Sequence, residues 1–206
     1  VMLVMSRASM ARITEVLAEK PSINDDDAKD IAVTDGSIEF DDVSFSYNGN
    51  PDNPNLEHIK LKIASGETIG IIGGTGSGKT TICSLLARFY DPQSGAITVG
   101  GAPVYENPAV KARMSVIPDE LFYFGAASTR DMMRFYRGIY PSFDMERYEK
   151  LREIFALDDT RPIRRLSRGM QKQSAFWIAL AARPEVLVLD EPVDGLDPVM
   201  RRQVWS

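Results

Sequence analysis

Apolar and polar positions along the chain follow two different periods. Over residues 2–19 apolar side chains recur at helical spacing, which predicts a helix. From residue 38 apolar and polar side chains alternate, and this period of two predicts strands at residues 38–47 and 59–63, with a turn or bulge at Asp41-Asp42. The short β-branched run at residues 68–72 predicts a further, buried strand.

The second half of the chain mixes helical and strand patterns. They predict helices at about 78–90, 128–138, 144–156 and 168–182, and strands at 96–99 and 114–117. Ser167 precedes the last of these helices and is a residue type that caps a helix N-terminus. Residues 186–189 form a continuous valine and leucine run, typical of a strand buried on both faces of a parallel sheet. Alternating strands and helices predict an α/β fold.

Composition narrows the class of protein. The chain has 206 residues, of which 44% are hydrophobic and 26% charged, as in soluble globular proteins. Its single cysteine, Cys83, allows no disulfide within the chain and favours a reducing compartment. No apolar run approaches the roughly 20 residues of a membrane-spanning helix. The net charge of −5 argues against nucleic acid as a partner.

A glycine-rich segment between the strand at 68–72 and the following helix carries the strongest chemical signal. It reads Gly73-Gly74-Thr75-Gly76-Ser77-Gly78-Lys79-Thr80, followed by Thr81. This spacing is that of a P-loop, or Walker A motif, whose backbone N–H groups and helix N-terminus hold phosphates. Lys79 is expected to reach the β- and γ-phosphates of ATP, and the Thr80 hydroxyl to bind Mg²⁺. The alternative is a glycine-rich turn that ends in Lys-Thr, which the flanking strand and helix disfavour.

Two carboxylates end the apolar run at residues 186–189. In P-loop proteins such a strand delivers an aspartate to the Mg²⁺ shell, a role that falls to Asp190. Glu191 would then act as general base on the attacking water. On its own, the motif could also be an acidic strand end before Pro192.

The segment Leu166-Ser167-Arg168-Gly169-Met170-Gln171 carries a family resemblance. Together with the P-loop and the Asp-Glu-Pro strand end, it resembles the signature of ABC ATPases, usually Leu-Ser-Gly-Gly-Gln. The chain departs from that form at Arg168 and Met170. The resemblance implies that Ser167 and Gly169 bind the γ-phosphate of ATP held by a partner subunit. In isolation, the hexapeptide reads as an ordinary serine-capped helix.

The resemblance implies roles for three further residues. Tyr47 falls where the family has an aromatic side chain that stacks on adenine, although a tyrosine at a strand end can also belong to the core. Asp119 stands where the family has a glutamine that binds Mg²⁺, and a carboxylate can do the same. Asp197 lies in a loop that, in the family, crosses the dimer interface and contacts the partner's ATP.

The resemblance also implies an architecture. It is an α/β P-loop NTPase (RecA-like) core with a mostly parallel sheet, an antiparallel β-subdomain at about 37–70 and an α-helical insertion at about 120–165. Residues 1–36 would be a helix and acidic linker from the end of a membrane domain. Residues 37–206 would be an ABC-type ATP-binding domain that lacks its C-terminal portion.

The implied function is ATP hydrolysis that powers transport, with ATP and Mg²⁺ bound between two domains that meet head to tail. The expected partners are a second ATP-binding domain, identical or different, and a transmembrane subunit or domain. The expected location is the cytoplasmic side of the cell membrane. Two alternatives stay open. One is an ATP-binding fragment without turnover, because the family's switch histidine is absent and His58 lies in the β-region. The other is a soluble ABC ATPase without a transport role.

The resemblance changes character along the chain. Residues 1–100 resemble exporters that fuse membrane and ATPase domains, whereas residues 104–206 resemble stand-alone bacterial efflux subunits. The charge changes at the same place: residues 1–105 carry 8 Lys and Arg against 14 Asp and Glu, and the remainder carry 16 against 15. We therefore hypothesise that the chain is a natural, engineered or artefactual fusion.

Overall fold

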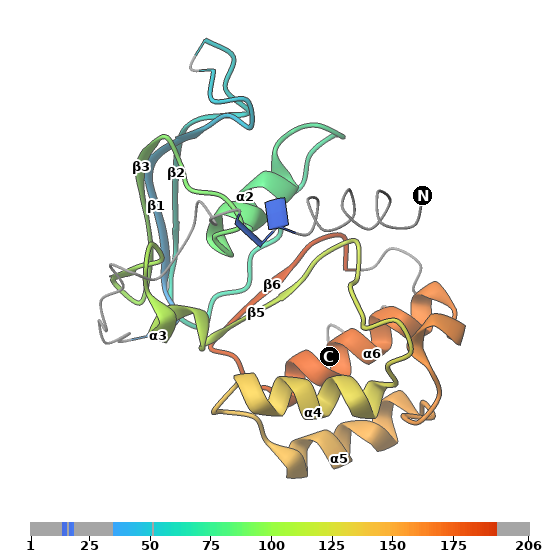
Figure 1. The fold of residues 1–206 in the computed structure, drawn as a ribbon. Coiled ribbons are helices and arrows are strands. Elements are labelled where there is room, and N and C mark those ends of the chain that lie inside the picture. The colour runs from blue at the N-terminus through green and yellow to red at the C-terminus, as the bar shows by residue number, and fades with distance from the viewer. Residues whose placement is uncertain (1–13, 16, 19–34, 51, 193–206) are drawn as a thin grey trace, which may run out of the picture.

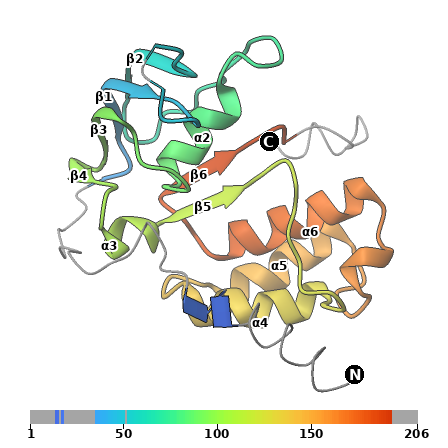
Figure 2. The same ribbon diagram turned by 45° about the horizontal axis from the view of Figure 1, so that its top comes forward.

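A computed structural model describes residues 14–15, 17–18, 35–50 and 52–192. The predicted leading helix falls mostly outside the described residues, although the four positions described within it are helical. The remainder forms a sheet part and a helical part, with a pair of strands between them (Figures 1 and 2). No helix among the described residues is long and apolar enough to cross a membrane.

The first part is a four-stranded antiparallel sheet in the order β2-β1-β3-β4. Its strands are β1 (Ile38–Phe45), β2 (Leu56–Ile63), β3 (Ser94–Val99) and β4 (Ala102–Pro103). The bulge predicted in β1 is present at Asp42, whose φ is 54°, and it shifts the pairing between Phe40 and Val43. The shift keeps Phe40 and Val43 on the buried face. Gly95 lies opposite, where an added Cβ would stand 2.5 Å from the Asp41 and Asp42 carbonyl oxygens.

The second sheet is a parallel pair, β5 (Met114–Ile117) and β6 (Val186–Leu189), in continuous register. Val186 and Val188 pack into a core shared with the antiparallel sheet and helix α2 (Lys79–Leu86). Leu187 and Leu189 pack on the other face, against the core of the helical part. The prediction of a strand covered on both faces is therefore confirmed.

The helical part covers the second face of the β5–β6 pair (Figures 1 and 2). Its helices are α4 (Thr129–Ile139), α5 (Met145–Phe155) and α6 (Arg168–Ala181), with a 3₁₀ turn at Ile163–Arg165; a short helix α3 (Pro108–Lys111) precedes β5. Trp177 of α6 is fully buried and stacks on Tyr148 of α5 at 4.6 Å between ring centroids. Its indole N–H donates to the Tyr148 carbonyl at 2.8 Å, so one side chain fixes α5 on α6 both by packing and by hydrogen bonding.

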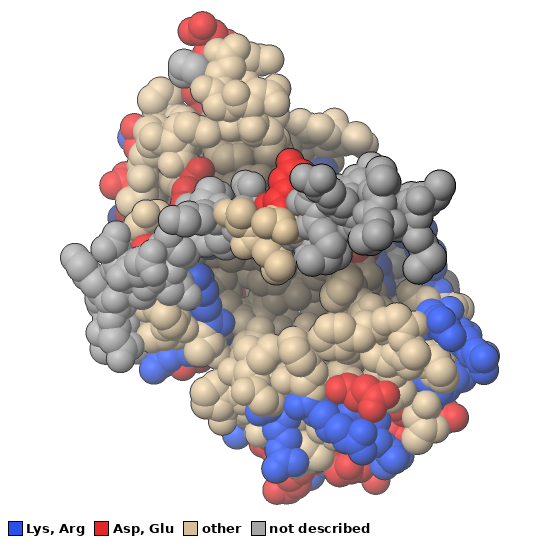
Figure 3. All heavy atoms as spheres, in the orientation of Figure 1, with Lys and Arg blue, Asp and Glu red and all other residues tan. Residues whose placement is uncertain are grey.

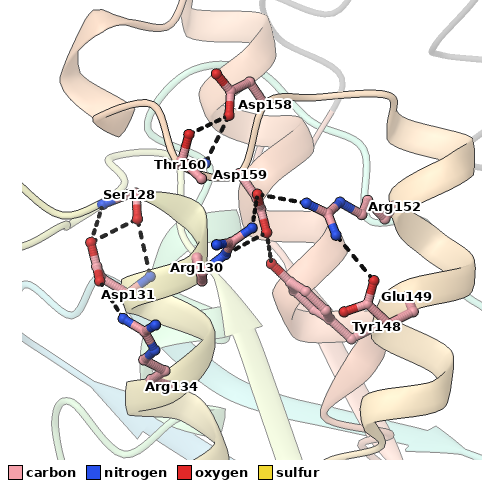
Figure 4. Close-up of polar contacts among 10 residues, drawn as sticks. All are labelled: Ser128, Arg130, Asp131, Arg134, Tyr148, Glu149, Arg152, Asp158, Asp159 and Thr160. Atoms are coloured by element: carbon pink, nitrogen blue, oxygen red, sulfur yellow. Dashed lines mark hydrogen bonds and ion pairs between the residues drawn. The ribbon is translucent and has the colours of Figure 1, made fainter.

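A buried carboxylate holds the loop after α5 against α4 and α5 (Figure 4). Asp159 is 2% exposed and accepts two hydrogen bonds from Arg130, at 2.9 and 3.1 Å. Arg152 donates to the same carboxylate at 3.0 Å. Burying a carboxylate is unfavourable unless charged partners surround it, and here α4 and α5 each supply one. The cluster therefore fixes the start of the segment that leads to Ser167.

The predicted strand at residues 68–72 is wrong. These residues form no ladder, and the Ile72 side chain is 96% exposed. A strand requires a hydrogen-bonded neighbour, and β5 and β6 pair only with each other among the described residues. The sequence pattern predicted the strand from side-chain type alone, whereas strand formation depends on the backbone partner.

The helix predicted at 78–90 is shorter than expected. It ends at Leu86, and Arg88 takes a left-handed conformation with a φ of 56°. The buried Arg88 guanidinium pairs with Asp91 and Glu106, so side-chain burial turns the chain before the helix can continue. Helices α4, α5 and α6 agree with their predicted ranges within one residue at each end.

Charge follows the division between the two parts. Lys and Arg side chains gather over the helical part, whereas few show on the sheet part in the same view (Figure 3). The change of charge along the sequence near residue 105 therefore corresponds to a change between regions of the fold.

Candidate nucleotide-binding site

The P-loop forms the link between residues 68–72 and α2. Its backbone curves so that the Ser77 N–H donates to the Gly74 carbonyl at 3.2 Å. Lys79, the first residue of α2, folds its ammonium back onto the loop and donates to the Gly73 and Gly74 carbonyls, each at 2.9 Å. The ammonium therefore lies against the loop, where a phosphate cradled by the loop would meet it.

Gly78 is the residue that lets the loop enter the helix. Its φ is 90°, and an added Cβ would stand 2.5 Å from Leu56 Cδ2 of β2. The left-handed conformation favours glycine, whereas the Leu56 methyl group could move to make room for a Cβ. Helix α2 has no acidic residue of its own in its first turn, so no side chain of that turn neutralises its N–H groups and positive dipole end. This is the arrangement that P-loops use to bind phosphate.

An open pocket of about 210 Å³ lies beside the loop. It is lined by Tyr47, Asn55 and residues 76–81. Tyr47 is about half exposed and packs edge-on against Phe45 and Tyr90, while its hydroxyl donates to the Thr81 hydroxyl at 3.2 Å. An aromatic side chain and a phosphate loop therefore share one pocket, which is a combination suited to a nucleotide.

The end of β6 reaches the first turn of α2. The Thr80 hydroxyl donates to Asp190 Oδ1 at 3.2 Å. Asp190 is 8% exposed, and its own N–H donates to the Ile117 carbonyl of β5. A hydroxyl and a carboxylate oxygen side by side are the hard ligands that Mg²⁺ prefers, so these two residues fit the ion. No three His, Cys, Asp or Glu side chains gather as a metal site within the described part of the chain.

The same carboxylate influences Cys83 on α2. Burial raises the pKa of the half-buried Cys83 thiol to about 11, and the negative charge of Asp190 adds to the effect. The thiol is therefore neutral at physiological pH and has little nucleophilic character.

Glu191 follows Asp190 in an unusual backbone conformation. Its φ is 47°, in the left-handed region that costs a non-glycine residue about 1–2 kcal/mol. The side chain is exposed, whereas the carbonyl accepts a hydrogen bond from Lys172 Nζ at 2.5 Å. The same ammonium donates to Asp119 Oδ1 at 3.3 Å. The loops that follow β5 and β6 therefore meet at one lysine.

Lys172 was missed by the sequence reasoning. It is 3% exposed, and it shares the buried face of α6 with Phe176 and Ala179, four and seven positions further on. A lysine at a helical position otherwise taken by apolar residues is a signal that sequence alone offers. Its partners were not predictable, because Asp119 and Glu191 lie in other segments.

The ABC signature segment begins α6. Ser167 is the predicted N-cap, and its hydroxyl accepts the Met170 N–H at 3.3 Å. Ser167 is exposed, Gly169 is partly exposed, and the first turn of α6 carries no acidic residue. The β5–β6 pair lies between α2 and α6, so the two helix N-termini belong to different regions of the chain (Figures 1 and 2). Asp197 lies outside the described residues.

The family model described as "ABC transporter" matches residues 56–194. The chain belongs to the ABC transporter family. The match includes the P-loop, the signature segment and the end of β6. It also covers both sides of residue 104, so residues 56–100 and 104–194 lie within one family match. Whether the two halves have different origins stays a hypothesis.

Two curated relatives illustrate the range of the family. The chain is 33% identical over 167 residues to the ABC transporter ATP-binding protein YtrB of Bacillus subtilis, covering 81% of this chain and 56% of that protein. It is 32% identical over 205 residues to an ATP-dependent lipid A-core flippase of Chromobacterium violaceum, covering 91% of this chain and 34% of that protein. The ABC chain thus spans about half, or less, of the length of these relatives.

Solved structures agree on the fold. A bacterial Atm1-family ABC exporter with ATP bound superimposes with a TM-score of 0.81 at 22% identity, covering 98% of this chain and 37% of that chain. A putative ABC transporter ATP-binding protein from Pyrococcus furiosus gives a TM-score of 0.70 at 26% identity, covering 82% of each chain. The predicted α/β P-loop fold is confirmed, although among the described strands only β5 and β6 are parallel, where a mostly parallel sheet was expected.

Proposed function

We propose that this ABC chain binds MgATP and hydrolyses it to ADP and phosphate, and that hydrolysis powers transport by a membrane protein. The contact between Thr80 and Asp190 carries the proposal, because it joins the P-loop helix to the acidic end of β6. It places the Asp190 carboxylate beside Thr80, which lines the same pocket as Lys79 and Tyr47.

ATP would lie along this pocket. The N–H groups of the P-loop and of the first turn of α2 would donate to phosphate oxygens. Lys79 would exchange its bonds with the loop carbonyls for stronger, charge-assisted bonds to the β- and γ-phosphates. Tyr47 would lie against adenine, since its ring lines the pocket and is about half exposed.

Thr80 and Asp190 are the residues that would hold Mg²⁺. The ion neutralises part of the phosphate charge when bound. The role of Asp119 as a third ligand is a separate proposal, because its carboxylate pairs with Lys172 in this structure.

Hydrolysis requires a water aligned with the bond between the γ-phosphorus and the bridging oxygen. Glu191 would accept a proton from this water as its oxygen bonds to phosphorus, and the bridging bond would break to release ADP. Lys79 would stabilise the charge on the transferred phosphoryl group. Most of the rate enhancement would come from positioning and charge.

A second ATP-binding domain would complete the site. Ser167, Gly169 and the N-terminus of α6 would approach the γ-phosphate bound by the partner, as would Asp197. The exposure of Ser167 and the lack of acidic residues in the first turn of α6 support this assignment. The partner would be a second copy or a related domain. A transmembrane partner is supported by the relatives, which include an ATP-dependent lipid A-core flippase, and such a partner would hold the chain at the cytoplasmic face of the membrane.

Two measurements on the full chain test the proposal. Equilibrium titration with ATP and Mg²⁺ should show saturable binding, and phosphate release should show repeated turnover. Binding without turnover would reduce the chain to an ATP-binding module. A chain that does not bind ATP would contradict the proposal altogether.

A further inference from the structure

Lys172 is a buried cation that joins three elements of the site. It lies in the second turn of α6 and is 3% exposed. Its ammonium donates to Asp119 Oδ1 at 3.3 Å, in the loop after β5, and to the Glu191 carbonyl at 2.5 Å, directly after β6. The helix that starts at Ser167 is therefore bonded to both loops at the carboxyl ends of the parallel strands.

Asp119 makes this burial possible. An ammonium removed from water is strongly unfavourable unless an anion compensates its charge. The ion pair that Lys172 forms within the described residues is with Asp119. The Asp119 side chain is 41% exposed, so it keeps contact with water while it holds the buried lysine. The ion pair with Lys172 therefore gives Asp119 a role that does not require a metal ion.

The hydrogen bond from Lys172 stabilises the backbone conformation of Glu191. Its left-handed φ of 47° is unfavourable for a residue with a side chain. The Lys172 bond ends on the carbonyl of Glu191 itself, the peptide group that fixes where the backbone turns. Loss of the ammonium would release that turn, and with it the direction in which the Glu191 carboxylate points.

We propose that Lys172 is a positioning residue for Glu191, and that Asp119 is the counter-ion that keeps Lys172 in place. The proposal rests on the proposed function, in which Glu191 is the general base. Lys172 would also link the N-terminus of α6, which would meet the partner's ATP, to the general base Glu191. A shift of α6 when its N-terminus meets the partner's γ-phosphate would reach Glu191 through Lys172.

Three variants separate positioning from stability. Lys172→Met keeps the length of the side chain and removes its charge. Lys150→Met is the matched control, because Lys150 lies on α5 with a 71% exposed side chain and pairs only with Glu146 among the recorded ion pairs of the described residues. The double variant Asp119→Asn/Lys172→Met removes both charges and so leaves no unpaired one.

Kinetics of MgATP hydrolysis by the full chain give the first readout. We expect Lys172→Met to lower kcat at least about tenfold, as for a displaced general base, with KM within about threefold of the unmodified chain. The double variant should recover thermal stability without recovering kcat. A kcat equal to that of Lys150→Met, or a kcat that returns together with stability, would overturn the proposal.

Hydrogen exchange gives a second readout that needs no turnover. The Asp190 N–H donates to the Ile117 carbonyl, so its exchange reports on the junction of the two loops. We expect faster exchange after β5 and after β6 in Lys172→Met, and no change in Lys150→Met. Unchanged exchange in both variants would refute the link itself. If the unmodified chain binds ATP without turnover, the proposed function fails, while exchange still decides whether Lys172 holds the Glu191 turn.

Discussion

Thr80 and Asp190 lie 110 positions apart in the sequence, and their side chains meet at 3.2 Å. This contact joins the first turn of α2 to the end of β6, although no strand of the described residues pairs on the free side of β6. The hydroxyl and the carboxylate are therefore held together by the packing of α2 and β6 into one core. The arrangement of the proposed ATP site therefore comes from the fold itself.

Lys79 should dominate phosphate binding. Lys79→Ala removes an ammonium that would form charge-assisted bonds, so we expect ATP affinity to fall about ten- to a hundredfold, corresponding to about 1.5–3 kcal/mol. Lys60→Ala is the control, since Lys60 lies on β2 with a 70% exposed side chain. Calorimetric titration measures both. Equal affinities of the two variants would argue against the assigned role of Lys79.

Gly78 should tolerate no side chain. Gly78→Ala places a Cβ against Leu56 and forces a φ of 90°, so we expect a loss of stability of at least about 1–2 kcal/mol, together with weaker ATP binding. Gly138→Ala is the control. Gly138 is an exposed helical glycine with open space around it, and the change should stabilise α4 by up to about 1 kcal/mol. Urea unfolding distinguishes the two, and similar effects of both would be inconsistent with the loop geometry.

The Cys83 thiol should lose its proton at a higher pH than an ordinary cysteine. Its pKa is raised to about 11 in the folded chain from an ordinary value of 9.0. The thiol therefore contributes stability that is fully present below about pH 9 and is lost as the pH rises towards 11, because only the unfolded chain ionises readily in that range. The rate of alkylation by iodoacetamide should have its midpoint near pH 11 in the folded chain and near pH 9 in urea. Coincident midpoints would show that the thiol is not shielded.

Asp159 should matter for stability more than any surface carboxylate. Asp159→Asn leaves Arg130 and Arg152 without their shared anion, so we expect a loss of about 3 kcal/mol in the free energy of unfolding. Asp158→Asn, next to it, should cost much less, because Asp158 is bonded to Thr160 in an exposed turn. Chemical denaturation gives both values. A loss as small for Asp159 as for Asp158 would mean that the cluster in Figure 4 contributes little.

Local patterns predicted much of the fold. The N-cap at Ser167, the bulge at Asp42 and the buried strand at residues 186–189 all depend on side chains close in sequence, and each is confirmed. The family was predicted in the same way, because each of its motifs is a short run of residues that can be read directly from the sequence.

Other features depend on contacts between distant segments. Residues 68–72 have the composition of a buried strand, but no strand pairs with them in the described part of the chain. The ion pair between Asp119 and Lys172 joins residues 53 positions apart, and nothing in the sequence near either residue predicts the other as its partner. The Arg88 turn that shortens α2 likewise depends on Glu106. Tertiary contacts decide these cases, and sequence pattern does not contain them.

The most direct test of the account compares Glu191→Gln with the unmodified chain in MgATP hydrolysis, with ATP binding followed in parallel. The amide keeps the size of the side chain and removes the base, so kcat should fall by about 10²–10⁴ while ATP affinity is retained. Turnover in the unmodified chain that is lost in this way would establish an ATPase with Glu191 as its base. Turnover that survives in Glu191→Gln, or an unmodified chain that binds ATP and never hydrolyses it, would contradict that claim.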